Sequence, residues 1–343
     1  MMAGRGEGIV AAGGPARHIP VMLTEALQAL SPEAGDIVVD GTFGAGGYTE
    51  AILETADCKV IAIDRDPDSI AEGRDLAECY PGRLALVLGR YGDMREIAEA
   101  DGVTAVDGVA LDLGVSSMQL DQPARGFAFS QPGPLDMRMS KEGRPASEIV
   151  NELPERDLAE ILAVLGEERR ARAIARAIVA RRAEQPILTT GELAEIVARV
   201  LGRKRDETKH PATRTFQALR LYVNSELDEL AKGLGAAERL LKAGGRLVVV
   251  TFHSLEDRIA KRFLASRSGP KPKGSRHLPE QKGEVLLPSF QLLNRRPVSP
   301  SKDEIRLNPR ARSAKLRAAL RTDAPAHALD LGALGLPRIA NPV

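Results

Sequence analysis

A glycine-rich turn between two short apolar runs most strongly constrains the fold of this chain. The runs cover residues 37–40 (IVVD) and 59–64 (KVIAID), both rich in β-branched residues, and a helical pattern follows the turn. The turn contains four glycines: Gly41, Gly44, Gly46 and Gly47. Because glycine has no Cβ, such a turn can be tight and can approach a ligand closely. The pattern predicts a parallel strand–helix–strand unit with a nucleotide-binding edge.

Two further apolar runs, residues 108–114 (GVALDLG) and 244–254 (GGRLVVVTFHS), continue the alternation of strands and helices. A step from one parallel strand to the next needs a few tens of residues, yet more than 125 residues separate these two runs. Residues 154–202 show helical periodicity and a Thr189-x-x-Glu192 capping box, with no strand pattern. We therefore predict an α/β fold whose sheet is interrupted by a helical insertion over residues 119–222.

Composition excludes several classes of protein. The chain has 343 residues, 43% hydrophobic and 28% charged, which is too apolar for a disordered chain and typical of neither collagen nor a coiled coil. Its two cysteines, Cys58 and Cys79, have no partners at metal-ligand spacing, so neither a disulfide framework nor a metal site is expected. No stretch approaches the ~20 apolar residues of a membrane span. We expect a soluble cytoplasmic protein with no membrane contact.

Acidic residues end three of the predicted strands: Asp40, Asp64 and Asp112. Ligands bind outside the carboxyl ends of such strands, and Asp64 can accept both ribose hydroxyls of a nucleoside. A dinucleotide would bring an anionic pyrophosphate, whereas S-adenosylmethionine brings a sulfonium cation. Three carboxylates favour the cation, and the glycines read GxGGxT in place of GxGxxG. A nicotinamide dinucleotide is the alternative cofactor, and a glycine turn that binds nothing is the structural alternative.

Two more residues are candidates for the same site, each with a structural alternative. Tyr91 follows a further apolar run, residues 84–88 (LALVL), and can pack on an adenine ring. Any stacking on an adenine ring must come from very few residues, because the chain has only eleven aromatic residues and no tryptophan. Core packing explains a lone tyrosine equally well. Gln119 reaches the ligand only if the segment after Asp112 wraps over it; otherwise it is a surface amide.

Many longer segments carry a resemblance to a known family: HIPVMLTEAL, DGTFGAGGYT, AIDRDP, LDLGVSSMQLD, RGFAF, GPLDMRM, GEER, HPATRTFQALR, NSEL, FHSLEDR and NPRARSAKLR. From about His18 to Arg321 the chain resembles the bacterial small-subunit ribosomal RNA methyltransferases that act on cytosine N4. The resemblance implies a class I methyltransferase with a Rossmann-like sheet and an inserted all-helical substrate-recognition domain. It also implies that the chain uses S-adenosylmethionine to methylate one cytosine amino group in the decoding region of 16S rRNA. The family's cofactor contacts fall on Gly46, Gly47, Tyr48, Asp64, Tyr91, Asp112 and Gln119.

The strand pattern and the resemblance together divide the chain into five segments. We expect a disordered N-terminal segment (1–17), a first part of the methyltransferase domain with the cofactor site (18–118), the helical insertion (119–222), a second part with a basic RNA-contacting segment (223–321), and a loose C-terminal tail (322–343). The methyltransferase domain is then discontinuous in sequence.

Two residues are candidates for the chemistry on the cytosine amino group. Its lone pair is delocalised into the ring, so the reaction needs a proton acceptor near the nitrogen. Many amino methyltransferases carry an Asp/Asn-Pro-Pro-aromatic segment after the fourth strand, but this chain has Asp112-Leu-Gly-Val-Ser-Ser. We therefore favour a cofactor role for Asp112 over a catalytic one. His253, before a predicted Ser254-x-x-Asp257 cap, is the other candidate, unless it only packs at the helix start.

Residues 203–220 are predicted to hold the RNA. They contain six basic and two acidic residues around His210 and Phe216, and Pro211 breaks any continuous helix. We expect His210, Arg214 and Arg220 to contact the substrate, whose target base must be single-stranded or flipped. A solvated helix end is the alternative.

The near-neutral net charge hides a basic segment. Lysine and arginine total 48 against 47 acidic residues, yet residues 258–321 hold 17 basic and four acidic residues. The net charge of this segment is +13, which leaves −12 for the remainder of the chain. We favour phosphate contact by this segment, beginning with Arg258, and a solubilising exposed arm is the alternative.

Three other functions fit parts of the sequence. Methylation of another nucleic acid, such as DNA or tRNA, fits because no motif reads a base sequence directly. A non-catalytic RNA-binding assembly factor would keep the fold and the basic segment without turnover. A nicotinamide oxidoreductase would bind a dinucleotide. The favoured partner is the rRNA of the small ribosomal subunit, and the sequence indicates no oligomeric state.

Overall fold

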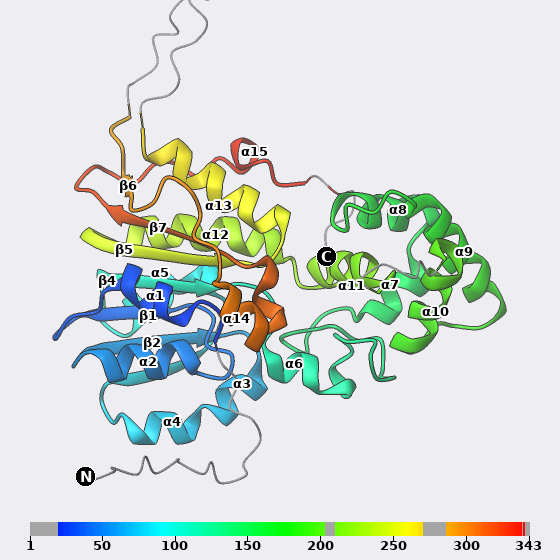
Figure 1. Cartoon of the computed structure of the whole chain (residues 1–343), viewed down its shortest axis with the longest axis horizontal. Coiled ribbons are helices and arrows are strands. Elements are labelled where there is room, and N and C mark those ends of the chain that lie inside the picture. Colours follow the sequence, from blue (N-terminus) through cyan, green and yellow to red (C-terminus); the bar gives the residue numbers. More distant parts are fainter. Residues whose placement is uncertain (1–19, 203–209, 270–285, 338, 340–343) are drawn as a thin grey trace, which may run out of the picture.

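The computed structural model describes residues 20–202, 210–269, 286–337 and 339, and its centre is a seven-stranded sheet (Figure 1). In spatial order the strands are β3 (Leu84–Leu88), β2 (Lys59–Asp64), β1 (Ile37–Asp40), β4 (Val106–Asp112), β5 (Leu241–Thr251), β7 (Lys315–Arg321) and β6 (Phe290–Leu292). Neighbouring strands from β3 to β5 are parallel, whereas β7 is antiparallel to β5 and β6. The four strand runs predicted from sequence are confirmed, the apolar run 84–88 forms β3, and β5 begins at Leu241, three residues ahead of the predicted run.

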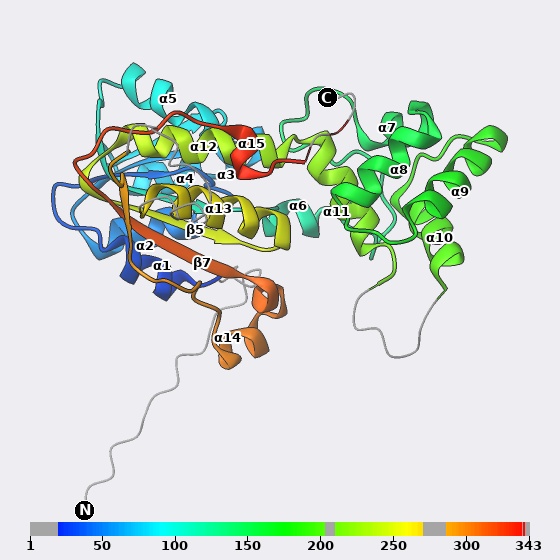
Figure 2. The ribbon, with the colours of Figure 1, turned by 90° about the horizontal axis from the view of Figure 1, so that it is seen from above.

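Helices cover both faces of the sheet (Figure 2). On one face, α1 (Leu23–Leu30) and α2 (Gly47–Thr55) enclose a buried cluster with β1, β2 and β7. On the other face lie α5 (Met94–Ala100), α12 (Glu226–Leu240) and α13 (Ser254–Arg267). Shorter elements connect the strands: α3 (Pro67–Glu72), α4 (Arg74–Cys79) and η1 (Tyr91–Asp93). None of the described helices is long and apolar enough to cross a membrane.

The long gap between β4 and β5 is filled by helices, as the sequence predicts. They are α6 (Ser117–Asp121), η2 (Pro123–Arg125), α7 (Ala146–Glu152), α8 (Glu155–Val164), α9 (Ala171–Glu184), α10 (Thr190–Leu201) and α11 (Thr213–Val223). Within the described part of this region, the sheet receives no strand, and an isolated bridge joins Pro134 to Thr189. The predicted capping box of Thr189 and Glu192 is confirmed at the start of α10. Figure 1 shows α7 to α11 gathered beside the sheet.

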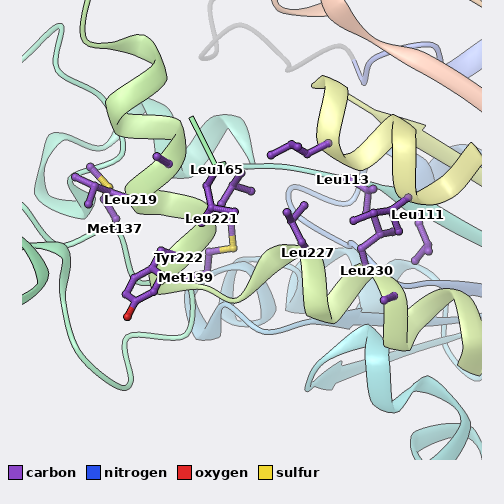
Figure 3. Close-up of a cluster of buried hydrophobic side chains, with 14 of the residues drawn as sticks. Leu111, Leu113, Met137, Met139, Leu165, Leu219, Leu221, Tyr222, Leu227 and Leu230 are labelled. Atoms are coloured by element: carbon purple, nitrogen blue, oxygen red, sulfur yellow. The ribbon is translucent and has the colours of Figure 1, made fainter. Parts of the chain in front are cut away.

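One continuous hydrophobic core joins these helices to the sheet (Figure 3). Leu111 and Leu113 of the β4 segment and Leu227 of α12 belong to the same buried cluster as Leu165 and Leu221 from the helical region. The helical residues therefore do not rely on a separate core, and the burial of apolar surface ties the two parts together.

The C-terminal residues are packed, and the prediction of a loose tail is wrong for residues 322–337. The short helix α15 (Leu331–Leu334) buries Leu334, and Ala324 is buried as well. The backbone N–H of His327 donates to Glu238 of α12 at 3.0 Å. Unpatterned composition did not reveal these contacts because they are made with distant helices. The predicted N-terminal segment, residues 1–17, lies outside the described residues.

Candidate functional site

A pocket of about 330 Å³ opens at the carboxyl ends of β1, β2 and β4, where parallel α/β sheets bind ligands. Twelve residues were expected to contact the cofactor or the substrate or to act in catalysis, and seven of them line it: Gly47, Tyr48, Asp64, Tyr91, Asp112, Gln119 and Arg220. The other five lie outside its lining: Gly46, His210, Arg214, His253 and Arg258. The chain thus brings the proposed cofactor residues together and leaves most of the proposed substrate residues elsewhere.

The glycine turn shapes the floor of the pocket. Gly44 and Gly46 have φ values of +54° and +81°, a left-handed conformation that glycine adopts readily. Gly46 begins α2 as its N-cap, and a Cβ there would lie 2.9 Å from the side chain of Leu76. A Cβ on Gly47 would collide with the ring of Pro20, which also lines the pocket. The turn therefore needs glycine for its conformation and for close packing.

Asp64, at the end of β2, is held by two backbone amides. Gly44 N–H donates to Oδ2 at 2.7 Å, and Asp66 N–H donates to Oδ1 at 2.8 Å. Burial nevertheless raises the pKa of Asp64 to about 6. A carboxylate has about four acceptor positions, so these two bonds leave capacity for further donors in the pocket.

Asp40 and Asp112 end neighbouring strands but have different surroundings. The carboxylate of Asp40 accepts from Thr42 N–H at 3.1 Å and from the hydroxyl of Thr49 at 2.7 Å, and it does not line the pocket. Asp112 lines the pocket, and its Oδ1 is buried without a hydrogen-bond partner among the described residues. The expectation that three strand-end acids face the ligand is therefore wrong for Asp40.

The electrostatic state of Asp112 follows from this burial. Desolvation first, and then the charges of Asp40 and Glu256, raise the pKa of Asp112 well above its ordinary value. A buried acceptor without a donor costs free energy that a ligand's donor or positive charge can offset. Within the described residues, no group of three histidines, cysteines or acids is arranged to hold a metal ion.

The two tyrosines of the pocket also hold the structure around it. The hydroxyl of Tyr48 donates to the carbonyl of Val21 at 2.6 Å and so fixes the segment before α1. The ring of Tyr91 lies against Gly233 of α12, where no Cβ could fit, while the residue also lines the pocket. Ligand contact and core packing, the two alternatives for Tyr91, are therefore compatible.

Gln119 lies on α6, which covers one side of the pocket. Its Nε2 donates to Asp66 at 2.8 Å, and its Oε1 accepts from Ser116 N–H at 3.1 Å in a capping box. Arg125 also donates to Asp66, at 2.8 Å. The segment after Asp112 therefore does wrap over the pocket, and the amide of Gln119 is largely engaged in holding it there.

Several residues in the pocket lining were not predicted to belong to the site: Pro20, Thr42, Arg65, Met139, Phe252 and Arg310. Arg65 directly follows Asp64, and its Nη1 donates to the carbonyl of Asn224 at 2.7 Å. Its position after a strand-end acid was a signal that could have found it. Arg310 comes from a distant part of the chain, and only the fold brings it to the pocket.

His253 caps α13, and the predicted cap at Ser254 is wrong by one residue. The Nδ1 of His253 accepts from Glu256 N–H at 3.4 Å, and its Nε2 lies 3.0 Å from Glu256 Oε1. Burial alone would raise the pKa of Glu256, but His253 and Arg220 lower it below its ordinary value. The imidazole is thus turned toward Glu256, and the neighbouring Phe252 lines the pocket in its place.

The described residues that were predicted to contact the substrate do not form one patch, and residues 203–209 of the predicted RNA segment lie outside the described part of the chain. Arg220 lines the pocket and makes a bidentate ion pair with Glu226, at 2.8 and 2.9 Å. The ring of His210 packs against the ring of Phe129, with the centroids 4.6 Å apart and the planes tilted by 36°. Arg214 and Arg258 both reach Glu167: Arg214 donates to its carbonyl at 3.2 Å and Arg258 to its carboxylate at 3.0 Å.

The described parts of the basic segment, residues 258–269 and 286–321, are not an exposed arm, because β6 and β7 belong to the sheet, and residues 270–285 lie outside the described residues. Several of its cations are used internally. Arg267 pairs with buried Glu238 at 2.6 Å, and the buried Arg321 donates to four backbone carbonyls. Lys315 and Arg317 share Asp257. Other cations of the segment are exposed: Lys261, Arg262, Arg295, Arg296, Lys302, Arg306, Arg310 and Arg312.

The sheet order with an antiparallel β7, the glycine turn after β1, the acid ending β2 and the pocket across these ends define a class I S-adenosylmethionine-dependent methyltransferase. The model of the MraW methylase family matches residues 15–322. The chain therefore belongs to the MraW methylase family.

Curated relatives match almost the whole chain. A protein of Parvibaculum lavamentivorans named Ribosomal RNA small subunit methyltransferase H is 58% identical over 318 residues, which is 93% of this chain and 93% of the relative. One of Paramagnetospirillum magneticum with the same name is 55% identical and covers 91% of this chain and 98% of the relative. Among solved structures, a putative rRNA methylase from Clostridium thermocellum matches with a TM-score of 0.41 and 12% identity, covering 89% of this chain and 99% of that one.

Proposed function

We propose that the chain transfers the methyl group of S-adenosylmethionine to the exocyclic N4 of a cytosine in the decoding region of small-subunit rRNA. The observation that carries the proposal is a pocket lined by two half-buried acids, Asp64 and Asp112, at the strand ends of this family's sheet. Relatives 58% identical, named as small-subunit rRNA methyltransferases, support the choice of substrate.

The residues of the pocket fit S-adenosylmethionine. Asp64 has acceptor capacity for ribose hydroxyls, and the unpartnered Oδ1 of Asp112 suits a ligand that brings a donor or a positive charge. Gly44 and Gly47 line the pocket, and Tyr91 offers a ring to the adenine. When bound, the cofactor supplies an electrophilic methyl group.

The protein's contribution to the reaction is to position the cofactor and the cytosine. S-adenosylmethionine would supply the methyl group, and the N4 nitrogen that receives it must give up one proton to an acceptor beside it. Burial raises the pKa of Asp112 well above its ordinary value, and its Oδ1 has no donor among the described residues, so we assign Asp112 to the cofactor. His253 lies outside the lining and faces Glu256, so we assign it to capping and test its catalytic role separately.

The RNA side of the proposal involves both parts of the chain. Residues 119–222 supply the helical substrate-recognition region, with Arg220 reaching the pocket and His210 beside an aromatic cluster of Phe129 and Phe216. The exposed cations of residues 295–312 supply phosphate contacts. A partner of this kind places the protein in the cytoplasm.

Methyl transfer to ribosomal substrates tests the proposal. Purified protein is incubated with methyl-labelled S-adenosylmethionine and either intact small subunits or naked 16S rRNA, and the labelled nucleoside is then identified. We expect N4-methylcytidine at a single position. Another methylated nucleoside would refute the substrate, and cofactor binding without transfer would support the alternative of an assembly factor. An Asp64→Asn variant, which loses the ribose-binding carboxylate, is the matched control.

A further inference from the structure

A segment near the end of the chain forms part of the pocket mouth. It comprises α14 (Lys302–Leu307) and η3 (Pro309–Ser313), drawn in orange in Figure 1 near α6. Arg310 Nη1 donates to the hydroxyl of Ser117 at 2.7 Å, and its Nη2 lies 2.7 Å from Asp121. Glu304 accepts from Met22 N–H at 2.6 Å on the opposite side. The segment therefore connects α6 with the strap of residues 20–22.

The pocket-lining arginines differ in how easily a ligand can replace the carboxylate with which each one pairs. Arg220 pairs with Glu226 and Arg90 with Glu229, two carboxylates whose side chains are only 10% and 5% exposed. Displacing either arginine would leave a buried charge without its partner, which is costly. Arg310 pairs with Asp121, whose side chain is 64% exposed, so water can solvate that carboxylate when the pair opens.

Arg310 is also suited by shape and position to bind a phosphate. Its guanidinium has five N–H donors in a planar fork, of which Ser117 and Asp121 use two. It lines the pocket and is 45% exposed, and it shares its segment with the exposed Arg306 and Arg312. It therefore lies where the deep pocket meets the basic surface.

We propose that Arg310 binds the backbone phosphate of the target nucleotide at the mouth of the pocket, with the phosphate replacing Asp121. The base enters the pocket toward the methyl donor, while its phosphate stays at the rim. Ser117 holds the guanidinium in place during the exchange. This inference rests on the proposed function, because it takes RNA as the substrate.

The test compares three single variants, Arg310→Ala, Asp121→Ala and Arg312→Ala. Binding of intact small subunits is measured at several salt concentrations, and binding of S-adenosylmethionine is measured by calorimetry. Arg310→Ala is expected to weaken subunit binding about tenfold and to lower the salt slope by about one, with cofactor affinity unchanged. Asp121→Ala is expected to bind subunits at least as tightly as the wild type, because it removes the competing carboxylate.

The control and the contrary outcomes separate the possible roles. Arg312 carries the same charge on η3 but does not line the pocket, so Arg312→Ala is expected to have a smaller effect. Equal losses of subunit affinity in Arg310→Ala and Arg312→Ala would overturn the proposal, because they would show that only the total positive charge of the segment matters. Weaker cofactor binding in both Arg310→Ala and Asp121→Ala, with subunit binding unchanged, would overturn the proposal. It would show that the ion pair between Arg310 and Asp121 serves only to hold α6 in place. A wild type that binds no subunits would refute the proposed function itself.

Discussion

Asp64 and Asp112 each lower the stability of the folded chain when ionised, and each has an acceptor oxygen available to a ligand. Burial raises the pKa of Asp64 from 3.8 to about 6, so the folded chain holds this proton more tightly than the unfolded chain. The stability contributed by the protonated acid is therefore lost as the pH rises from 3.8 to about 6. The pKa of Asp112 is raised for the same reason. Both acids destabilise the folded chain when ionised, as expected of groups kept for a ligand.

The affinity for S-adenosylmethionine is expected to fall as pH drops through about 6, because protonated Asp64 no longer accepts two ribose hydroxyls. Calorimetric titration between pH 5 and pH 8 measures this dependence. An Asp64→Asn variant should bind weakly at every pH, without the inflection. A wild-type affinity that stays constant across the range would contradict the assignment of Asp64 to the ribose.

Asp112→Asn is expected to raise the thermal stability of the ligand-free protein at pH 8 and to weaken cofactor binding at least tenfold. The amide carries no charge to desolvate, whereas the ionised acid does. Thermal unfolding with and without cofactor measures both effects. Lower stability of the ligand-free variant would show that the carboxyl group has a structural partner.

At the scale of elements, the sequence revealed the parallel strands, missed β6 and β7, and failed on contacts between distant segments. Parallel strands buried on both faces read as apolar runs, so β1, β2 and β4 could be predicted from local patterns. Asp40 and Asp112 both end a strand, and only the position of Thr49 on α2 shows that Asp40 is internal. Arg310 reaches the pocket through the sheet topology, which no local pattern encodes.

The cap of α13 yields a prediction at the same scale. His253→Ala is expected to lower the unfolding free energy by about 1 kcal/mol, because the start of α13 loses its side-chain acceptor. Asparagine can cap but cannot take up a proton near neutral pH. We expect His253→Asn to keep both the stability and the turnover of the wild type, measured by chemical denaturation and single-turnover methyl transfer. Lost turnover with intact cofactor binding in the Asn variant would restore His253 as the proton acceptor.

At the scale of the whole molecule, the shared core makes the helices and the sheet one cooperative structure. Leu227 of α12 and Leu221 of α11 belong to a cluster that extends from β4 into the helical region (Figure 3). Glu167 adds a second connection between the turn after α8 and the start of α13, because its carboxylate accepts a hydrogen bond from the Ser254 hydroxyl and pairs with Arg258. The position of the helices relative to the pocket is therefore set by packing and not by a linker.

Leu227→Ala is expected to lower the unfolding free energy by about 2–5 kcal/mol while unfolding remains a single transition. Denaturant unfolding followed by circular dichroism measures both quantities. Leu188→Ala, at a side chain 59% exposed, serves as the control and should change the free energy by less than about 0.5 kcal/mol. Two separate transitions in the wild type would contradict the shared core.

The position of Arg310 near the end of the chain determines when the pocket is completed during synthesis. Pocket walls come from Pro20 near the start of the chain and from Arg310 near its end, and β7 completes the sheet between β5 and β6. During synthesis the glycine turn leaves the ribosome early, but the pocket mouth closes only after residue 310 has emerged. A prematurely terminated chain would therefore carry the cofactor motifs without the completed pocket.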